Sequence, residues 1–296
     1  MSENFITIFT PTFNRAYTLP KLYESLTKQT SKDFTWLIID DGSTDNTQEL
    51  VKGWIKKNNI TIIYYKQPNQ GKSLAHNKGV NMTRTELFTC VDSDDYLNNC
   101  AVEEIIKAWR NNKENPNIIG VLAYKENVKD DHIVMYINES IVSTTLRDGY
   151  RKHDLKGDMM LIYRTNILNK YAFPKIEGEK FVPEAYLYDL LDQNGELVVL
   201  NKTLYYYEYL NDGYTNSMAK LLAHNPKGYI AYIKQRLYFD NNMKDKILDL
   251  IRYISMCISS GERVDFKVIN PTVILFCYPM GYILYLKKFK KYKKLK

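Results

Sequence analysis

The sequence predicts an α/β fold built on a doubly wound, mostly parallel sheet with a C-terminal helical extension. The main observation is that short β-rich segments alternate with amphipathic helical patterns over residues 1–125, which is typical of βαβ units. A second observation is that clusters of aspartate directly follow two of the β-rich segments. The third is that this alternation stops after about residue 125 and helical patterns become longer towards the C-terminus.

The elements of the alternating region follow from residue type and periodicity. Segments rich in β-branched and aromatic residues predict strands at Phe5–Thr10, Phe34–Asp40, Ile60–Tyr65, Leu87–Val91 and Ile118–Lys125. Apolar residues at three- and four-residue spacing predict helices at Leu19–Gln29, Thr47–Lys57, Ser73–Met82 and Val102–Asn111. Asp45, with Gln48 three residues later, is typical of a capping box that opens the second helix.

The second half of the chain is expected to be mainly helical. Pro183–Asn194 is expected to form a helix with proline at its first position. The pattern is helical again from Tyr229 to about Ile258, with a break at Asp240–Lys244. Tyr205–Tyr207 are expected to pack in the sheet and the core. With 296 residues the chain has room for one large domain or two modest ones.

The charge of the chain is concentrated at its C-terminus. The formal net charge is +7, from 41 lysines and arginines against 34 acidic residues. Seven lysines and no acid lie in residues 287–296, so residues 1–286 sum to zero. A neutral body disfavours a protein that coats nucleic acid, and no nucleic-acid partner is expected.

An uncharged segment, residues 268–286, precedes the basic tail and is interrupted by two prolines, an asparagine and a glycine. It is slightly short for a bilayer span, which needs about 20 apolar residues. We expect a segment that lies on the membrane surface, with the lysines on anionic lipid and with Phe289, Tyr292 and Leu295 in the interface. A full span and a solvated, frayed basic end are the alternatives.

Two acidic clusters are the strongest functional signal. Asp40 and Asp41 directly follow one apolar strand segment, and Asp92, Asp94 and Asp95 follow another. Because parallel strands share one carboxyl edge, where open α/β sheets bind ligands, we expect both clusters to face one crevice. Carboxylates gathered there suit Mg²⁺ or Mn²⁺, which bind through one or two carboxylates together with substrate phosphates. Each cluster alone is also typical of a turn or a helix N-cap.

Two further loops are expected near the same edge. The segment TPTFNR follows the first strand, and its Arg15 is either a partner for a phosphate or a carboxylate, or a solvated cation. The segment QGKS is similar to part of a P-loop, but that motif requires glycine at the position of Lys66, so no Walker motif exists here. Lys72 in this segment is a candidate for neutralising a nucleotide.

In their order and spacing, the segments TPTFNR, DDGSTD, QGKSLAHNKG and VDSDDYL closely resemble the pattern of glycosyltransferase family 2. The resemblance is strong over residues 1–125 and looser over 150–215. It implies the GT-A fold and transfer of a sugar, with inversion, from a nucleotide-diphosphate sugar. On this basis we expect a GT-A domain over 1–215, with a nucleotide-sugar-binding half (1–125) and an acceptor-side half (126–215). A helical extension over 216–265 and an apolar segment with a basic tail over 266–296 follow.

The resemblance also implies roles for residues on the donor side. Thr10, Pro11 and Arg15 match the first nucleotide-contacting loop of the family. Asp41, with Asp40 beside it, matches the acid that contacts the uracil or the ribose.

Lys72 matches the loop that closes over the nucleotide. Asp92, Ser93 and Asp94 match the DxD motif of the family, in which Asp94 holds the metal and Asp92 holds the ribose or the metal. Asp95 extends this motif in the form DxDD and is assigned to the acceptor side.

An inverting transfer needs a carboxylate that deprotonates the acceptor hydroxyl. In the family this base lies at the start of a helix after the DxD region, and Glu184 in the segment FVPE fits that place best. Asp189 and Glu179 are the alternatives, because the family's commoner Glu-Asp pair is absent. Acids also favour helix N-termini for electrostatic reasons alone. Asp158 is expected to line the acceptor side.

The resemblance therefore predicts a glycosyltransferase that uses Mg²⁺ or Mn²⁺ and a UDP-sugar. The expected acceptor is a glycan or a lipid-linked sugar in bacterial surface polysaccharide synthesis. The enzyme is expected in the cytoplasm, peripheral at the inner face of the cell membrane. A sugar nucleotidyltransferase is one alternative, but TPTFNR lacks its glycine-rich phosphate loop. A non-catalytic nucleotide-sugar-binding protein at the membrane is another, and the intact DxD motif speaks against it.

Overall fold

The structure is a computed structural model that describes residues 4–129, 134–209, 218–239, 242–267 and 270–292. The chain folds as two compact units. The first contains Met1–Ala172 and Leu190–Tyr209, and the second contains Phe173–Asp189 and Leu210–Lys296. The strands belong to the first unit, whereas the second unit is built from helices.

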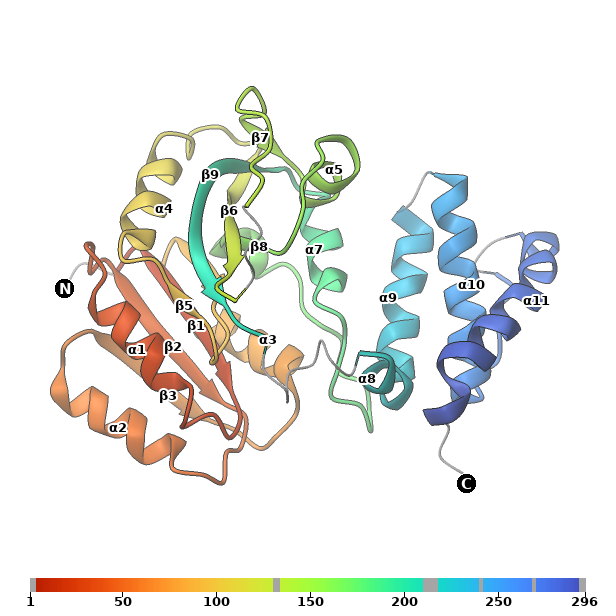
Figure 1. The fold of residues 1–296 in the computed structure, drawn as a ribbon, viewed down its shortest axis with the longest axis horizontal. Coiled ribbons are helices and arrows are strands. Elements are labelled where there is room, and N and C mark those ends of the chain that lie inside the picture. The colour runs from red at the N-terminus through yellow and green to blue at the C-terminus, as the bar shows by residue number, and fades with distance from the viewer. Residues whose placement is uncertain (1–3, 130–133, 210–217, 240–241, 268–269, 293–296) are drawn as a thin grey trace. The chain divides into compact units, whose positions relative to one another are not determined.

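A nine-stranded sheet forms the centre of the first unit (Figure 1). One half of the sheet is parallel and has the order β3-β2-β1-β4. Its strands are β1 (Ile6–Thr12), β2 (Phe34–Asp40), β3 (Thr61–Lys66) and β4 (Leu87–Cys90). These positions confirm the alternation that the sequence predicts, and the ends of the four strands differ from the predicted ends by at most two residues.

The other half of the sheet is mixed. β8 runs antiparallel to both β4 and β6, β9 runs parallel to β6, and β5 and β7 pair antiparallel with β9. These strands are β5 (Tyr96–Leu97), β6 (Ile118–Asn127), β7 (Ser143–Thr144), β8 (Met159–Arg164) and β9 (Glu196–Tyr207). The α/β class is confirmed, and the parallel character is concentrated in the half that the sequence pattern marks.

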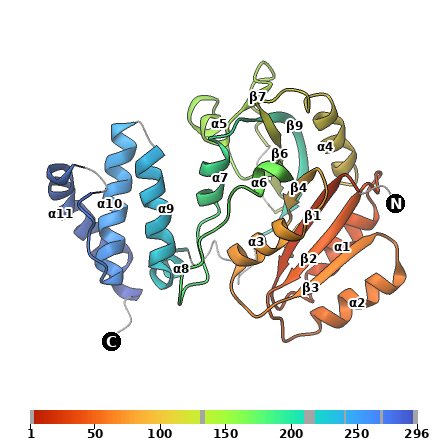
Figure 2. The ribbon, with the colours of Figure 1, turned by 180° about the vertical axis from the view of Figure 1, so that it is seen from behind.

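Helices cover both faces of the parallel half. α1 and α2 lie on one face of the sheet and α3 lies on the other, as Figures 1 and 2 show from opposite sides. The helices of this unit are α1 (Leu19–Thr27), α2 (Thr47–Lys57), α3 (Lys72–Met82), α4 (Ala101–Arg110), α5 (Leu146–Lys152) and α6 (Thr165–Leu168).

The alternation of side chains along β1 explains why both faces are covered. Ile6 and Ile8 point into one hydrophobic core with residues of α1, α2 and α4. Phe9 points the other way, where its ring stacks on Phe88 and meets the edge of His76 from α3. The strand is therefore buried on both sides, and every residue of it except the half-buried Pro11 is buried.

The start of α2 differs from the expected capping box. The N-cap residue is Asn46, and its side chain makes no capping hydrogen bond. Asp45 instead accepts hydrogen bonds from the backbone N–H and the hydroxyl of Thr47, and from the backbone N–H of Ala16. Its carboxylate thus joins the loop after β1 to the loop after β2.

The second unit is a helical bundle. Its elements are α7 (Ala185–Leu191, of which the last two residues belong to the first unit), α8 (Met218–His224), α9 (Pro226–Phe239), α10 (Met243–Ser260), α11 (Pro271–Lys288) and the 3₁₀ turn η2 (Lys290–Tyr292). The expected break between the two long helices is confirmed by the separate bounds of α9 and α10. The expected helix Pro183–Asn194 is wrong at both ends, because Pro183 and Glu184 precede α7 and the helix stops at Leu191. Its first position is Ala185 and not a proline.

The core of this unit lies between α9, α10 and α11. Gly281 of α11 permits close contact, since a Cβ there would lie 2.6 Å from Cγ2 of Ile254. Phe289 packs with Met256 and Tyr285 in a smaller cluster and is 5% exposed. The expectation that Phe289 enters a membrane interface is therefore wrong, because Phe289 lies one turn after Tyr285 on the buried stripe of α11.

Tyr292 is half-buried, and Leu295 lies outside the described residues. Among the helices that the structure describes, none combines the length and the hydropathy needed to cross a bilayer.

Candidate active site

The two acidic clusters lie at neighbouring strand ends. Asp40 is the last residue of β2, Asp92 follows β4 closely, and β1 pairs in parallel with both strands. The carboxyl ends of these strands therefore meet at one edge of the sheet, as expected. Lys72, the first residue of α3, reaches this edge and links the loop beside Asp41 to Asp92.

Asp41 fixes the loop that leads into α3. Its Oδ1 accepts hydrogen bonds from the Gln67 amide at 2.8 Å and from the Gln70 N–H at 2.9 Å, and its Oδ2 accepts the Gly71 N–H at 2.7 Å. Gly71 has a φ of 92°, which residues with a side chain rarely adopt. Asp41 and this glycine thus determine where Lys72 begins the helix.

Asp40 closes the DDGS turn from inside the fold. The side chain is fully buried, and Oδ1 accepts the Ser43 N–H at 2.7 Å. Oδ2 accepts the hydroxyl of Tyr64 from β3 at 2.5 Å. Burial, followed by this hydrogen bond and the Asp40 charge, raises the pKa of Tyr64. Asp40 is therefore held rigidly between two strands.

The DxD segment carries two carboxylates with opposite pKa shifts. Lys72 Nζ lies 2.5 Å from Asp92 Oδ1. Burial raises the pKa of Asp92, but the charges of Lys72 and then Lys125 outweigh burial and hold it below its ordinary value. Burial and then the charge of Asp92 raise the pKa of Asp94, against the opposing charges of Arg15 and Lys72. Acids and basic residues thus converge at this edge.

Tyr205 on β9 is a site residue for which the sequence indicated only packing. Its ring is fully buried, and its strand partners are Leu97 of β5 and Lys125 of β6. The hydroxyl donates to Asp95 Oδ2 at 2.6 Å and accepts the Asp92 N–H at 3.0 Å. The period-two alternation of β9 is the available sequence signal, and it does not show which tyrosine faces the acids.

Asp95 is held in this buried environment and is 8% exposed. Burial, and then the charge of Asp92, raise the pKa of Asp95 to about 7, with the Tyr205 hydrogen bond opposing them. Lys125 Nζ lies 4.0 Å from the centre of the Tyr205 ring, a cation–π contact that brings a positive charge to the same place. The backbone carbonyl of Asp158 accepts the Lys125 N–H, and the Asp158 side chain is exposed.

The remaining donor-side residues differ in exposure. Thr10 is fully buried within β1, and its hydroxyl accepts the indole N–H of Trp36 at 2.9 Å. Pro11 is half-buried in the same strand, and Ser93 is 6% exposed. The Thr10 side chain is therefore engaged in packing the strand.

The three base candidates belong to the second unit. Glu184 is exposed just before α7, and Asp189 lies within α7. Glu179 has a structural role: its two oxygens accept the N–H groups of Lys227 at 2.9 Å and Gly228 at 2.8 Å, at the N-terminus of α9. A carboxylate at a helix N-terminus is favoured by the exposed amides and the helix dipole.

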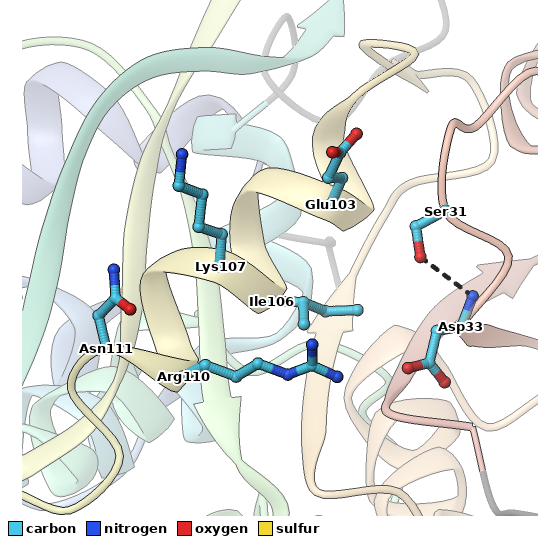
Figure 3. A pocket seen from close by; sticks show the side chains of 7 residues that line it. All are labelled: Ser31, Asp33, Glu103, Ile106, Lys107, Arg110 and Asn111. Atoms are coloured by element: carbon cyan, nitrogen blue, oxygen red, sulfur yellow. Dashed lines mark hydrogen bonds between the residues drawn. The ribbon is translucent and has the colours of Figure 1, made fainter.

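One pocket of the first unit lies away from these residues (Figure 3). It is formed by the loop before β2 and by α4, so it lies at the opposite end of β2 from Asp40. Acidic and basic side chains line it together with one isoleucine. Its residues are Ser31, Asp33, Glu103, Ile106, Lys107, Arg110 and Asn111.

The residues at the carboxyl edge fit a divalent cation. Asp92 and Asp94 supply hard carboxylate oxygens, and burial, followed by the charge of Asp92, raises the pKa of Asp94. In the described ranges, no group of three or more histidine, cysteine or acidic side chains is arranged to hold a metal. Mg²⁺ usually takes one or two carboxylates and completes its shell with substrate phosphates and water.

The fold is an α/β sheet whose carboxyl edge gathers acidic and basic side chains. Residues 7–172 match the family described as Glycosyl transferase family 2. Because this match spans more than half of the chain, the chain belongs to that family and is a glycosyltransferase.

Curated relatives are glycosyltransferases as well. Glycosyltransferase GlyG of Streptococcus pneumoniae is 23% identical over 217 residues, which are 70% of this chain and 71% of GlyG. Glycosyltransferase GlyA of the same species is 35% identical over 105 residues, 36% of this chain but only 15% of GlyA. A GalNAc(5)-diNAcBac-PP-undecaprenol β-1,3-glucosyltransferase of Campylobacter jejuni is 31% identical over 34% of this chain and 33% of its own length.

Solved structures share the fold. S. aureus TarS 1–349 in complex with UDP-GlcNAc has a TM-score of 0.62 at 17% identity, covering 96% of this chain and 92% of TarS 1–349. The mannosyltransferase PcManGT of Pyrobaculum calidifontis, in complex with GDP-Man and Mn²⁺, has a TM-score of 0.59 at 11% identity, covering 95% and 87%. The expected GT-A fold is confirmed.

Proposed function

We propose that this glycosyltransferase is an inverting enzyme that moves a sugar from a UDP-sugar to a glycan or lipid-linked acceptor. The observation that carries the proposal is the ion pair between Lys72 and Asp92, next to Asp94 and within electrostatic range of Arg15. A nucleotide diphosphate brings negative charge that needs cations on both sides. This edge offers basic side chains and carboxylates for a metal ion together.

Uracil is the proposed base of the donor nucleotide because TarS, which shares the fold, is described with UDP and with UDP-GlcNAc. The end of β1 and the Asp41 loop supply the proposed nucleotide contacts. Residues 1–125 form the donor half in this proposal, and residues 126–215 the acceptor-side half. The donor-binding set is Thr10, Pro11, Arg15, Asp40, Asp41, Lys72, Asp92 and Ser93.

Asp94 and Asp92 are the proposed ligands of Mg²⁺ or Mn²⁺. PcManGT, with the same fold, is described with Mn²⁺. When bound, such an ion stabilises the negative charge of the leaving diphosphate. Lys72 exchanges Asp92 for a phosphate oxygen when the donor binds, and Arg15 neutralises the charge that remains.

Glu184 is the proposed catalytic base, with Asp189 as the alternative. The carboxylate takes the proton of the acceptor hydroxyl as that oxygen attacks the anomeric carbon. The bond from the anomeric carbon to the diphosphate oxygen breaks on the opposite face, so the configuration inverts. The hydrogen bonds of Glu179 to the start of α9 disfavour Glu179 for this role.

A lipid-linked acceptor is proposed because the Campylobacter jejuni relative is named for an undecaprenol-linked glycan. Asp95 and Asp158 are assigned to the acceptor side. The pathway is bacterial surface polysaccharide synthesis, and the place is the inner face of the cell membrane, reached through the basic residues 287–296.

A thermal-shift panel of nucleotides and nucleotide sugars with Mn²⁺ tests the donor. A ligand at about 100 times its Kd stabilises the folded state by about 2.7 kcal/mol, so the true donor raises the Tm measurably. We expect UDP-sugars to do so and GDP-sugars not to. Consumption of a nucleoside triphosphate with a sugar phosphate would identify a nucleotidyltransferase instead. Donor binding without any sugar transfer or hydrolysis would identify a non-catalytic binding protein.

A further inference from the structure

Helix α11 exposes large apolar side chains along most of its length. Leu275, Phe276 and Ile283 are 62%, 75% and 50% exposed. Folded monomers rarely expose a contiguous apolar patch of this kind unless it binds something. We call this surface the α11 face and define it by Leu275, Phe276, Tyr278, Met280, Tyr282, Ile283 and Leu286, each more than a third exposed.

The opposite stripe of α11 attaches the helix to its own bundle. Ile274, Cys277, Gly281 and Tyr285 recur every three or four residues and are buried. Figures 1 and 2 both show α10 between α9 and α11. The helix is thus fixed on α10 by one stripe. The α11 face points away from α10 and stays available while the bundle is folded.

Positive charge borders this apolar face. Lys287, Lys288, Lys290 and Lys291 are exposed, and no acidic residue follows Asp265 in the sequence. Phe289, buried in the middle of this run, holds the lysines in a folded turn rather than a loose tail. The preceding acid, Asp265, is itself paired with Lys234 at 3.2 Å.

We propose that the α11 face docks on a bilayer that contains anionic phospholipid, with its apolar side chains among the acyl chains nearest the headgroups. The lysines then lie against lipid phosphates. This occupant satisfies both features, since lipid offers apolar chains and negative charge together. Tyr278 and Tyr282 are suited to such an interface because they have apolar rings and polar hydroxyls. A second copy of the chain would bring an equally basic run to the same place.

The inference deepens the proposed location at the membrane and rests on it, but it names a folded helix face as the anchor. Co-sedimentation of the full chain with vesicles tests it, using phosphatidylcholine with phosphatidylglycerol and phosphatidylcholine alone. The test variant is Phe276→Ser with Ile283→Ser. Its matched control is Tyr238→Ser with Met243→Ser, two apolar residues of α9 and α10 that are 82% and 60% exposed.

We expect the wild-type chain and the control to bind the anionic vesicles alike. Partitioning of the test variant should fall roughly ten- to a hundredfold, because two large apolar side chains no longer leave water. Replacing Lys287, Lys288, Lys290 and Lys291 by Gln should also weaken binding and reduce its salt dependence. If the test variant binds vesicles as the wild type does and the variant without the four lysines does not, binding depends on charge alone and the proposal is wrong.

The oligomeric state and the quenching of introduced tryptophans distinguish a membrane from a second copy of the chain on the α11 face. If the wild type does not bind vesicles and sediments as a dimer, and the test variant is monomeric, a second copy covers the α11 face and the proposal is wrong. The fluorescence of the tryptophan introduced by Phe276→Trp should be quenched by brominated lipid, and that of Tyr238→Trp should not. This measurement does not require the serine variants to fold. Donor hydrolysis, measured without vesicles, is expected to be unchanged in all variants. Its absence in a wild type that binds vesicles would refute the proposed function and leave the inference standing.

Discussion

Tyr205 donates a 2.6 Å hydrogen bond to Asp95, although 110 residues separate them in the chain. The same hydroxyl accepts the Asp92 N–H at 3.0 Å. One tyrosine of β9 therefore ties together both ends of the acidic DSDD segment. The conformation of that segment depends on the antiparallel pairing of β5 with β9, which brings Tyr205 opposite Leu97.

Tyr205→Phe should destabilise the fold and weaken the metal-dependent step. The change leaves the Asp92 N–H and Asp95 without their shared partner in a buried place, at about 1–3 kcal/mol of unfolding free energy. Urea unfolding and the Mn²⁺ concentration that gives half-maximal donor turnover measure the two effects. Tyr206→Phe is the control, because that hydroxyl accepts a 3.2 Å hydrogen bond from Asn98 on the half-buried side. If the two variants have the same unfolding free energy and the same Mn²⁺ requirement, the Tyr205 hydroxyl does not stabilise the acidic segment.

Lys72→Met should separate metal binding from donor binding. Lys72 neutralises Asp92, so its removal frees that carboxylate for Mn²⁺ and removes a cation that the diphosphate needs. We expect tighter Mn²⁺ binding without nucleotide and a donor KM raised about tenfold, as for loss of one charge-assisted contact. Calorimetry and steady-state kinetics provide these values. The control Lys78→Met removes a lysine that lies over the Tyr65 ring and should change neither the Mn²⁺ affinity nor the donor KM. A donor KM unchanged by Lys72→Met would count against Lys72 as a partner of the diphosphate.

Asp95 should make stability depend on pH. Its pKa is raised from 3.8 to about 7. The folded protein keeps a proton that the unfolded chain loses above about pH 4, so this contribution to stability is complete below 3.8 and is lost as the pH rises to about 7.

Asp95→Asn has no proton to lose, and its amide oxygen can still accept from Tyr205. Relative to the wild type, its unfolding free energy should rise by on the order of a few kcal/mol between about pH 4.5 and 7.5. Chemical denaturation in the presence of a chelator measures this difference. Both proteins contain Asp94, so its own titration largely cancels. A constant difference across that range would show that Asp95 titrates normally.

Glu184→Gln should lower kcat and leave donor binding intact. A general base contributes about 10²–10⁴-fold, and the amide cannot accept the acceptor proton. Glu177→Gln, an exposed acid of the same unit, should have no effect. Glu179→Gln should instead lower the Tm, because it weakens the contacts to Lys227 and Gly228. If Glu184→Gln keeps full activity and Asp189→Asn loses it, Asp189 and not Glu184 is the catalytic base.

The parallel half of the sheet could be predicted because its signals are local. Each strand from β1 to β4 is a short segment rich in apolar and β-branched residues, and α1 and α2 have apolar residues at helical spacing. The mixed half could not be predicted in this way. The strand order β4-β8-β6-β9 depends on which distant segments pair, and no local pattern records that choice. Phe289 is a different case, because it lies four residues after Tyr285 and continues the buried stripe of α11, so helical spacing alone places its ring inward.

The acidic edge of the candidate site followed from the sequence because strand ends are visible as apolar runs that stop at aspartates. Its electrostatics did not. The Lys72–Asp92 ion pair depends on the Asp41 hydrogen bonds that shape the loop before α3. The raised pKa of Asp95 depends first on burial within the folded unit and then on the charge of Asp92, and the hydrogen bond from Tyr205 on β9 opposes it. These are contacts between distant segments, so only the folded chain reveals them.

We propose that this edge carries out metal-dependent transfer from a nucleotide sugar. Release of UDP from UDP-sugars with Mn²⁺ tests it most directly, comparing the wild type, Asp94→Asn and Glu114→Gln, the last at an acid whose side chain is 91% exposed. We predict turnover in the wild type and in Glu114→Gln, loss with a chelator, and a decrease of about a hundredfold or more in Asp94→Asn. Turnover in Asp94→Asn equal to that of the wild type, with no effect of chelator, would show that transfer needs neither Asp94 nor a metal ion.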